Sequence, residues 1–92
     1  MKSIIQTQKE CFITGLQTGL HLHHCLHGSS NRKLSDKYGL TVWLNNEIHR
    51  QVHNGNTELD LLLKRTAQRK FEEKCGSREE FMKIFGKNYL EG

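Results

Sequence analysis

Histidines are the residues of this chain best suited to chemistry, and their spacing is unusual. The chain has six histidines among 92 residues; four of them fall between positions 21 and 27, and the other two are His49 and His53. Because this last pair is four positions apart, both imidazoles lie on one face of a helix and can reach the same metal ion. Two surface histidines on a polar helix would have the same spacing, so the pair alone does not establish a metal site.

The neighbouring pair His23-His24 offers a further ligand. The segment 20–26 starts with alternating apolar and polar residues and is predicted to be a strand. Since adjacent strand residues point to opposite faces, the two histidines cannot play the same role on one surface. One of them can join His49 and His53, and three protein ligands leave an open position for water or substrate. The other is free to act as a general base, because an imidazole ordinarily titrates near neutrality.

The two remaining histidines have weaker signals. His21 lies on the same predicted strand face as His23. It stays open as a substitute ligand or a phosphate contact, although a solvated strand residue is the simpler interpretation. His27 begins the polar segment that follows, and a functional role is the less favoured interpretation for it.

Three elements are expected to position the histidines. Residues 40–44, rich in β-branched and aromatic side chains, carry the strongest strand signal in the chain. The segment 27–39 before them is polar and is predicted to be a loop. Asn45 and Asn46 are candidate N-caps of a short helix over about 46–53.

The last third of the chain predicts helices and packing. Apolar residues at helical spacing indicate a long helix over about 58–75, for which Thr57 and Asp60 have the spacing of a capping box. Ser77-x-x-Glu80 is a second capping box and opens a final helix. We expect the apolar faces of these helices to pack in a small core or in a dimer interface, so a homodimer is a plausible assembly.

Together these elements predict one α+β domain over residues 1–92. Residues from about 11 to 53 carry the motif, and residues from about 57 to 90 form a helical C-terminal part. Residues 1–10 are expected to be an extended or frayed arm and residues 11–14 a short strand.

The order of these features resembles the HNH, or ββα-metal, nucleases, and most of all their small phage-encoded members. The resemblance rests on His23-His24, a basic Asn-Arg-Lys segment, the apolar strand 40–44 and His49-x-x-x-His53. It implies a ββα-metal core with added C-terminal helices and metal-dependent hydrolysis of DNA. In that family the first histidine of the pair binds the metal and the second is the general base. The resemblance therefore implies that His23, His49 and His53 are ligands and that His24 activates water.

The chain departs from the family pattern in two respects. Many members hold a structural zinc on two cysteine pairs, whereas the cysteines here are few, widely spaced and without a C-x-x-C motif. They are Cys11, Cys25 and Cys75. We therefore expect neither a structural zinc nor a disulfide framework. The middle asparagine of the family is also not identifiable, and Asn31 and Asp36 are both candidates for orienting His24.

One divalent ion is expected, drawn from Zn²⁺, Ni²⁺, Mn²⁺, Co²⁺ or Mg²⁺. An all-imidazole ligand set favours the first four, because Mg²⁺ prefers oxygen ligands.

The charge of the chain suits an anionic partner such as DNA. Lysine and arginine number 14 against 10 acidic residues, and the formal net charge is +4. The candidate DNA contacts near the expected metal are Arg32, Lys33, Lys37 and Arg50. Such contacts fix the position of the backbone without reading bases. A second basic set on the long helix, at positions 64, 65, 69 and 70, is explained equally well by a solvated face.

Two rival functions fit the same residues. The first is a non-catalytic, metal-stabilised module that binds nucleic acid or protein, for example a phage inhibitor of host defence. The second is a small basic protein with incidental histidines. No apolar run reaches the ~20 residues of a membrane span, and the N-terminal residues lack a signal-peptide core. We therefore expect no membrane association and a cytoplasmic protein, in the host cell if phage encoded.

Overall fold

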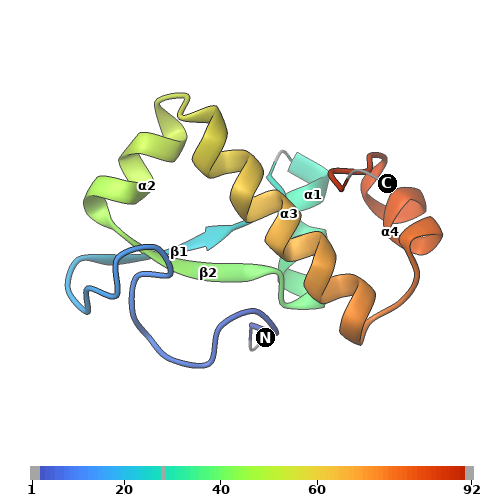
Figure 1. The fold of residues 1–92 in the computed structure, drawn as a ribbon, viewed down its shortest axis with the longest axis horizontal. Coiled ribbons are helices and arrows are strands. Elements are labelled where there is room, and N and C mark those ends of the chain that lie inside the picture. Colours follow the sequence, from blue (N-terminus) through green and yellow to red (C-terminus); the bar gives the residue numbers. More distant parts are fainter. Residues whose placement is uncertain (1–2, 28, 91–92) are drawn as a thin grey trace.

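The computed structural model describes residues 3–27 and 29–90, and Figure 1 shows how their elements are arranged. These residues contain a two-stranded antiparallel sheet and four helices, so the predicted α+β class is confirmed. The elements are β1 (Leu20–His24), α1 (Ser29–Tyr38), β2 (Thr41–Asn45), α2 (Asn46–His53), α3 (Thr57–Lys74) and α4 (Arg78–Phe85). Helices α2 and α4 lie toward opposite ends of the molecule, and α3 runs between them (Figure 1).

The sheet leads directly into the helix that carries two of the histidines. Strand β1 pairs with β2 so that His23 lies opposite Val42. Asn45 is both the last residue of β2 and the N-cap of α2, and its side chain accepts a hydrogen bond from the Ile48 amide at 3.1 Å. The predicted cap at Asn45 is therefore confirmed. Because no loop separates β2 from α2, the position of the helix relative to β1 is set by the strand pairing.

The prediction of a loop over 27–39 is wrong, because α1 covers most of that segment. Its polar composition favours a loop locally, but tertiary contacts stabilise the helix. Ser35 is buried, and its hydroxyl donates to the Leu26 carbonyl at 2.6 Å and accepts from the Leu26 amide at 3.2 Å. Leu34 and Tyr38, one turn apart, pack against the core. The cations predicted to lie in a loop therefore lie on a helix, and position 28 falls outside the described residues.

The N-terminal segment packs along β2 instead of forming a frayed arm. The Ile4 amide donates to the Gly39 carbonyl at 2.9 Å, and the Gln6 side chain accepts from the Trp43 amide at 2.8 Å. Residues 11–14 form a turn, so the predicted strand there is wrong. Phe12 nevertheless donates one backbone hydrogen bond to Trp43 at 2.8 Å. These bonds cover the β2 edge that faces away from β1. Residues 1 and 2 of the predicted arm lie outside the described residues.

The core lies between the sheet and the two C-terminal helices. Leu63, Ala67 and Phe71 line the buried face of α3, and Phe81 and Phe85 of α4 pack against them. Their aromatic rings meet at centroid distances that favour edge-to-face or offset contacts. This arrangement fixes α3 across the molecule, so that its N-terminal end approaches α2 (Figure 1).

Capping residues set the ends of these helices, and one cap lies one residue earlier than predicted. The Ser77–Glu80 capping box is present, and Gly86 ends α4 in the left-handed conformation at φ 79°. The capping box predicted for Thr57 and Asp60 is wrong, because Asn56 caps helix α3. The Asn56 side chain accepts a hydrogen bond from the Leu59 amide at 3.1 Å, and Thr57 is the first helical residue. No helix within residues 3–27 and 29–90 combines the length and apolar character needed to cross a membrane.

Candidate metal centre

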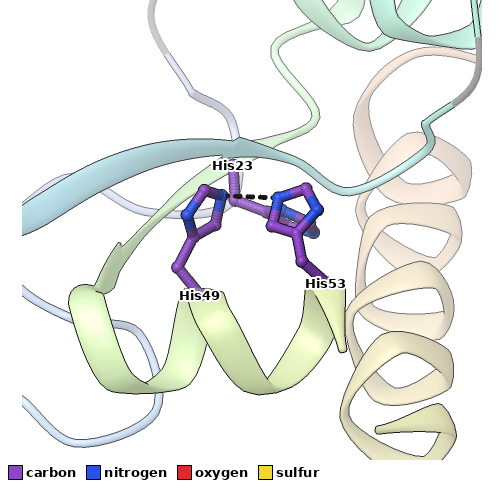
Figure 2. A group of neighbouring side chains, drawn as sticks. All are labelled: His23, His49 and His53. Carbon is purple, nitrogen blue, oxygen red and sulfur yellow. Dashed lines mark hydrogen bonds between the residues drawn. The ribbon is translucent and has the colours of Figure 1, made fainter. Parts of the chain in front are cut away.

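Three histidines from two elements converge at one point. His23 projects from β1 toward α2, and the rings of His49 and His53 rise from α2 to meet it (Figure 2). One nitrogen of each ring lies within 4.8 Å of the others. The Nε2 atoms of His49 and His53 are 3.0 Å apart. Ligand nitrogens of a tetrahedral zinc site lie about 3.3 Å from one another. The three residues predicted as ligands are therefore close enough to hold a metal ion after small side-chain adjustments.

His23 is the most informative member of this group. Only 4% of the residue is exposed, and its Nε2 atom is buried without a hydrogen-bond partner in the described part of the chain. An unsatisfied buried polar atom costs about 1–3 kcal/mol, so native structures rarely leave one. A metal ion on the Nε2 lone pair would satisfy this atom.

The surroundings of His23 and His49 favour the neutral form of both imidazoles. Burial, and then the nearby rings of His49, His27 and His53, lower the pKa of His23 to about 4. Burial also lowers the pKa of His49, with His53 and His21 adding to the effect. Metal ligation requires an unprotonated nitrogen, so at neutral pH His23 is ready to bind without first losing a proton.

His21 packs beside the cluster and is not part of it. Its ring stacks on that of His49 with centroids 5.0 Å apart, and its Nε2 contacts the Asn46 side chain. These contacts orient His49 and favour the interpretation of His21 as a supporting residue.

His24, the predicted general base, lies next to the candidate centre. It is half-buried, and its Nε2 is 3.7 Å from Asp36 Oδ1. That distance is too long for a hydrogen bond but suits an ion pair when the imidazole is protonated. Of the two candidate orienting residues, Asp36 is the one that approaches His24. Asn31, described on the same helix, forms no hydrogen bond with His24.

A cavity of about 170 Å³ connects the ligands with other polar groups. Its lining residues are Leu22, His23, His24, His27, Arg32, His49 and His53. His24 and Leu22 line it although strand alternation places both on the opposite face of β1 from His23. The structure therefore brings the three candidate ligands, the candidate base and one of the four predicted DNA contacts to a single cavity.

The other predicted DNA contacts lie outside this lining. Lys33 and Lys37 are exposed on α1, and the Lys37 ammonium lies 5.4 Å from the Tyr38 ring centre. Arg50 is exposed on α2 and pairs with Glu47. Of the four predicted DNA contacts, only Arg32 therefore lines the cavity.

The structure also places a histidine–carboxylate pair at the cavity, which the sequence did not predict. His27 Nε2 lies 2.8 Å from Asp60 Oδ1, and Lys64 Nζ lies 2.8 Å from Asp60 Oδ2. Burial opposes ionisation of Asp60, but the hydrogen bonds from Lys64 and His27 outweigh it and lower its pKa. Since a carboxylate can only accept, His27 Nε2 carries the proton and its Nδ1 is left for other partners. The two residues are 33 positions apart, so no local spacing could reveal the pair.

Comparison of the chain with protein-family models, curated proteins and solved structures finds no match in any of the three. A function must therefore be inferred from the residues and geometry of the site itself.

Proposed function

We propose that this chain is a metal-dependent endonuclease that hydrolyses phosphodiester bonds in DNA. In this proposal β1, β2 and α2 form a ββα-metal core of the HNH type, with His23, His49 and His53 as ligands. The observation that carries the proposal is the buried, unpartnered Nε2 of His23, which faces the other two imidazoles. Three neutral ligands leave the full charge of a divalent ion available to an anionic substrate.

The donor set favours a transition ion. Imidazole nitrogens suit Zn²⁺, Ni²⁺, Co²⁺ and Mn²⁺, whereas Mg²⁺ prefers oxygen. When bound, such an ion would supply Lewis-acid stabilisation of the charge that develops on the phosphate. The cavity beside the ligands leaves room for a phosphate group and for water.

The remaining groups at the cavity supply proton transfer and positioning. We assign His24 as the general base that accepts a proton from water. Asp36, at 3.7 Å, is placed to stabilise the imidazolium that results. Arg32 borders the same cavity and is suited to hold the phosphate oxygens in a bidentate contact. Positioning of this kind accounts for much of the rate enhancement in phosphoryl chemistry.

His27 is the second candidate for the base, because its hydrogen bond to Asp60 is short and fixes its ring. The two assignments differ in a measurable way. If His24 is the base, His24→Ala should slow cleavage by about 10²–10⁴-fold while metal content and DNA binding persist. If His27 is the base, the large loss should appear in His27→Ala, and Asp60→Asn should reduce cleavage as well.

Nicking of supercoiled plasmid tests the proposed function directly. The full chain, freed of metal with a chelator, is reconstituted with Zn²⁺, Ni²⁺, Co²⁺, Mn²⁺ or Mg²⁺ and assayed for nicked and linear products. We expect cleavage by the reconstituted protein, and none by the chelated protein or by His23→Ala. If the parent chain binds one equivalent of metal but never cleaves DNA, it is a metal-stabilised binding module.

The four predicted DNA contacts give a separate test of the substrate. Arg32→Ala and Lys33→Ala should weaken DNA binding about equally for all sequences and reduce the dependence of affinity on salt. Lys37 on α1 and Arg50 on α2 are expected to act in the same way. Metal binding should not change in these variants. If they bind DNA as the parent does, the substrate does not cross α1.

A further inference from the structure

We propose that α3 and the segment after α4 form a second phosphate-binding surface, which binds the backbone of a nucleic acid at a distance from the metal centre. This basic track consists of Lys64, Arg65, Arg69, Arg78 and Lys87. The inference rests on the proposed function for its choice of partner. The phosphate chemistry of the track, however, is argued from its own residues.

Arg65 and Arg69 are the centre of the track. They are four positions apart on α3, so their guanidinium groups lie on one face of the helix and repel each other. Neither side chain forms an ion pair with any residue in the described ranges, whereas Lys64 and Lys70 of the same helix both do. An anion that bridges the two guanidinium groups would remove this repulsion.

The surface is hollowed where these arginines lie. Arg65, Arg69, Arg78 and Leu90 line a cavity of about 300 Å³. The Arg65 Nε donates to the Tyr89 carbonyl at 3.0 Å, which holds the side chain in place. A guanidinium group that is already ordered loses little conformational freedom when it binds, and its fork of donors matches a phosphate.

The segment after α4 is held to α3 by a buried side chain. Gln68 is fully buried; its amide nitrogen donates to Asn88 Oδ1 at 2.7 Å, and its carbonyl oxygen accepts from the Tyr89 amide at 2.7 Å. These bonds place Lys87 and Tyr89 beside α3, where the Lys64 and Lys87 ammonium groups lie 5.4 and 5.5 Å from the Tyr89 ring centre. The track is therefore built on a fixed backbone.

The track is continuous with the metal centre. Asp60 contacts His27 at the histidine cavity, and it also lines a second hollow of about 390 Å³ together with Lys64, Arg65 and Lys87. Arg65 in turn borders the arginine cavity. From Lys64 to Arg69 the helix advances about 7.5 Å, which corresponds to roughly two nucleotide steps at ~3.4 Å each. This length fits a nucleic acid backbone better than a single phosphate ion.

Binding of DNA by metal-free protein tests the inference apart from catalysis. Affinity for a fluorescent duplex of about 20 base pairs is measured by anisotropy, with chelator present, between about 50 and about 200 mM salt. The test variant is Arg65→Gln/Arg69→Gln. The matched control is Lys74→Gln/Lys83→Gln, which removes the same charge from exposed positions outside both hollows.

We expect the arginine variant to lower the slope of log affinity against log salt by about 1.8 and to weaken binding on the order of tenfold at low salt. The control should retain the parent slope. Arg65→Lys/Arg69→Lys keeps both charges but removes the hydrogen bond from Arg65 to the Tyr89 carbonyl. It should retain most of the salt slope, which would show that the glutamine variant loses affinity through its missing charges and not through this hydrogen bond. Equal behaviour of the arginine variant and the control overturns the inference.

Titration with inorganic phosphate identifies the source of the phosphate group. If phosphate shifts the NMR signals of the Arg65 and Arg69 side chains while the Gln variant binds DNA as the parent does, the track binds free phosphate and the assignment to nucleic acid is wrong. Failure of the plasmid-nicking assay would leave the salt slopes unaffected, so the two proposals can fail separately.

Discussion

Protonation of His23 should destabilise the metal-free protein in a defined pH range. The pKa of this buried imidazole is about 4 in the folded chain, against an ordinary value near 6.5. Between these values the unfolded chain binds a proton that the folded chain does not. The free energy of unfolding must therefore fall as the pH is lowered from about 6.5 to about 4.

The size of the effect follows from the pKa difference. Each pKa unit corresponds to about 1.4 kcal/mol, so the shift of His23 amounts to about 3 kcal/mol. A chain of this length typically has a free energy of unfolding of about 5–14 kcal/mol. Protonation of one side chain should thus remove a substantial fraction of the stability, and each kcal/mol should lower the melting temperature by about 4–8 °C.

Urea unfolding at a series of pH values, with chelator present, measures this effect. The control is His23→Gln, which removes the titrating group and keeps a polar side chain of similar reach. All other side chains are the same in the two proteins, so the difference between the two pH profiles isolates His23. If the two profiles run parallel between about pH 6.5 and 4, burial does not hold His23 neutral and the argument for a ready metal ligand fails.

Three further outcomes are expected. At pH 7, Zn²⁺ at one hundred times its Kd should raise the free energy of unfolding by about 2.7 kcal/mol, and thermal melts should show this gain disappearing as the pH falls toward the pKa of His23, about 4. His49→Ala/His53→Ala should abolish stoichiometric metal binding in equilibrium dialysis; unchanged binding would exclude the site. Ser35→Ala should cost about 1–3 kcal/mol in urea unfolding, because it leaves two buried backbone groups of Leu26 unpaired. Exposed Ser30→Ala should change stability little.

Local signals in the sequence were sufficient for the caps at Asn45 and Ser77 and for the pairing of His49 with His53. Asn45 is the last residue of β2 and caps α2 by accepting a hydrogen bond from the amide of Ile48, three residues later. The capping box of Ser77 and Glu80 spans the same short distance in sequence. The spacing of His49 and His53 is a property of one helical turn. Such features depend on neighbouring residues only, so they can be predicted without knowing the fold.

The tertiary structure decided the features that depend on burial. Helix α1 forms from a polar segment because Ser35 bonds to Leu26, nine positions away, and because one apolar face of the helix packs against the core. A composition-based prediction weighs local propensity alone, and here the energy of these contacts outweighs it.

The same holds for the surroundings of the three candidate ligands. Only the folded chain buries the His23 nitrogen without a partner and brings Asp60 to His27 across 33 positions. Burial depends on the total packing around a side chain, and a contact between distant segments depends on the path of the whole chain. Residue types and spacing therefore indicate which side chains can bind a metal, while folding sets which of them is desolvated, which groups face the same cavity and which carboxylate lies beside which histidine.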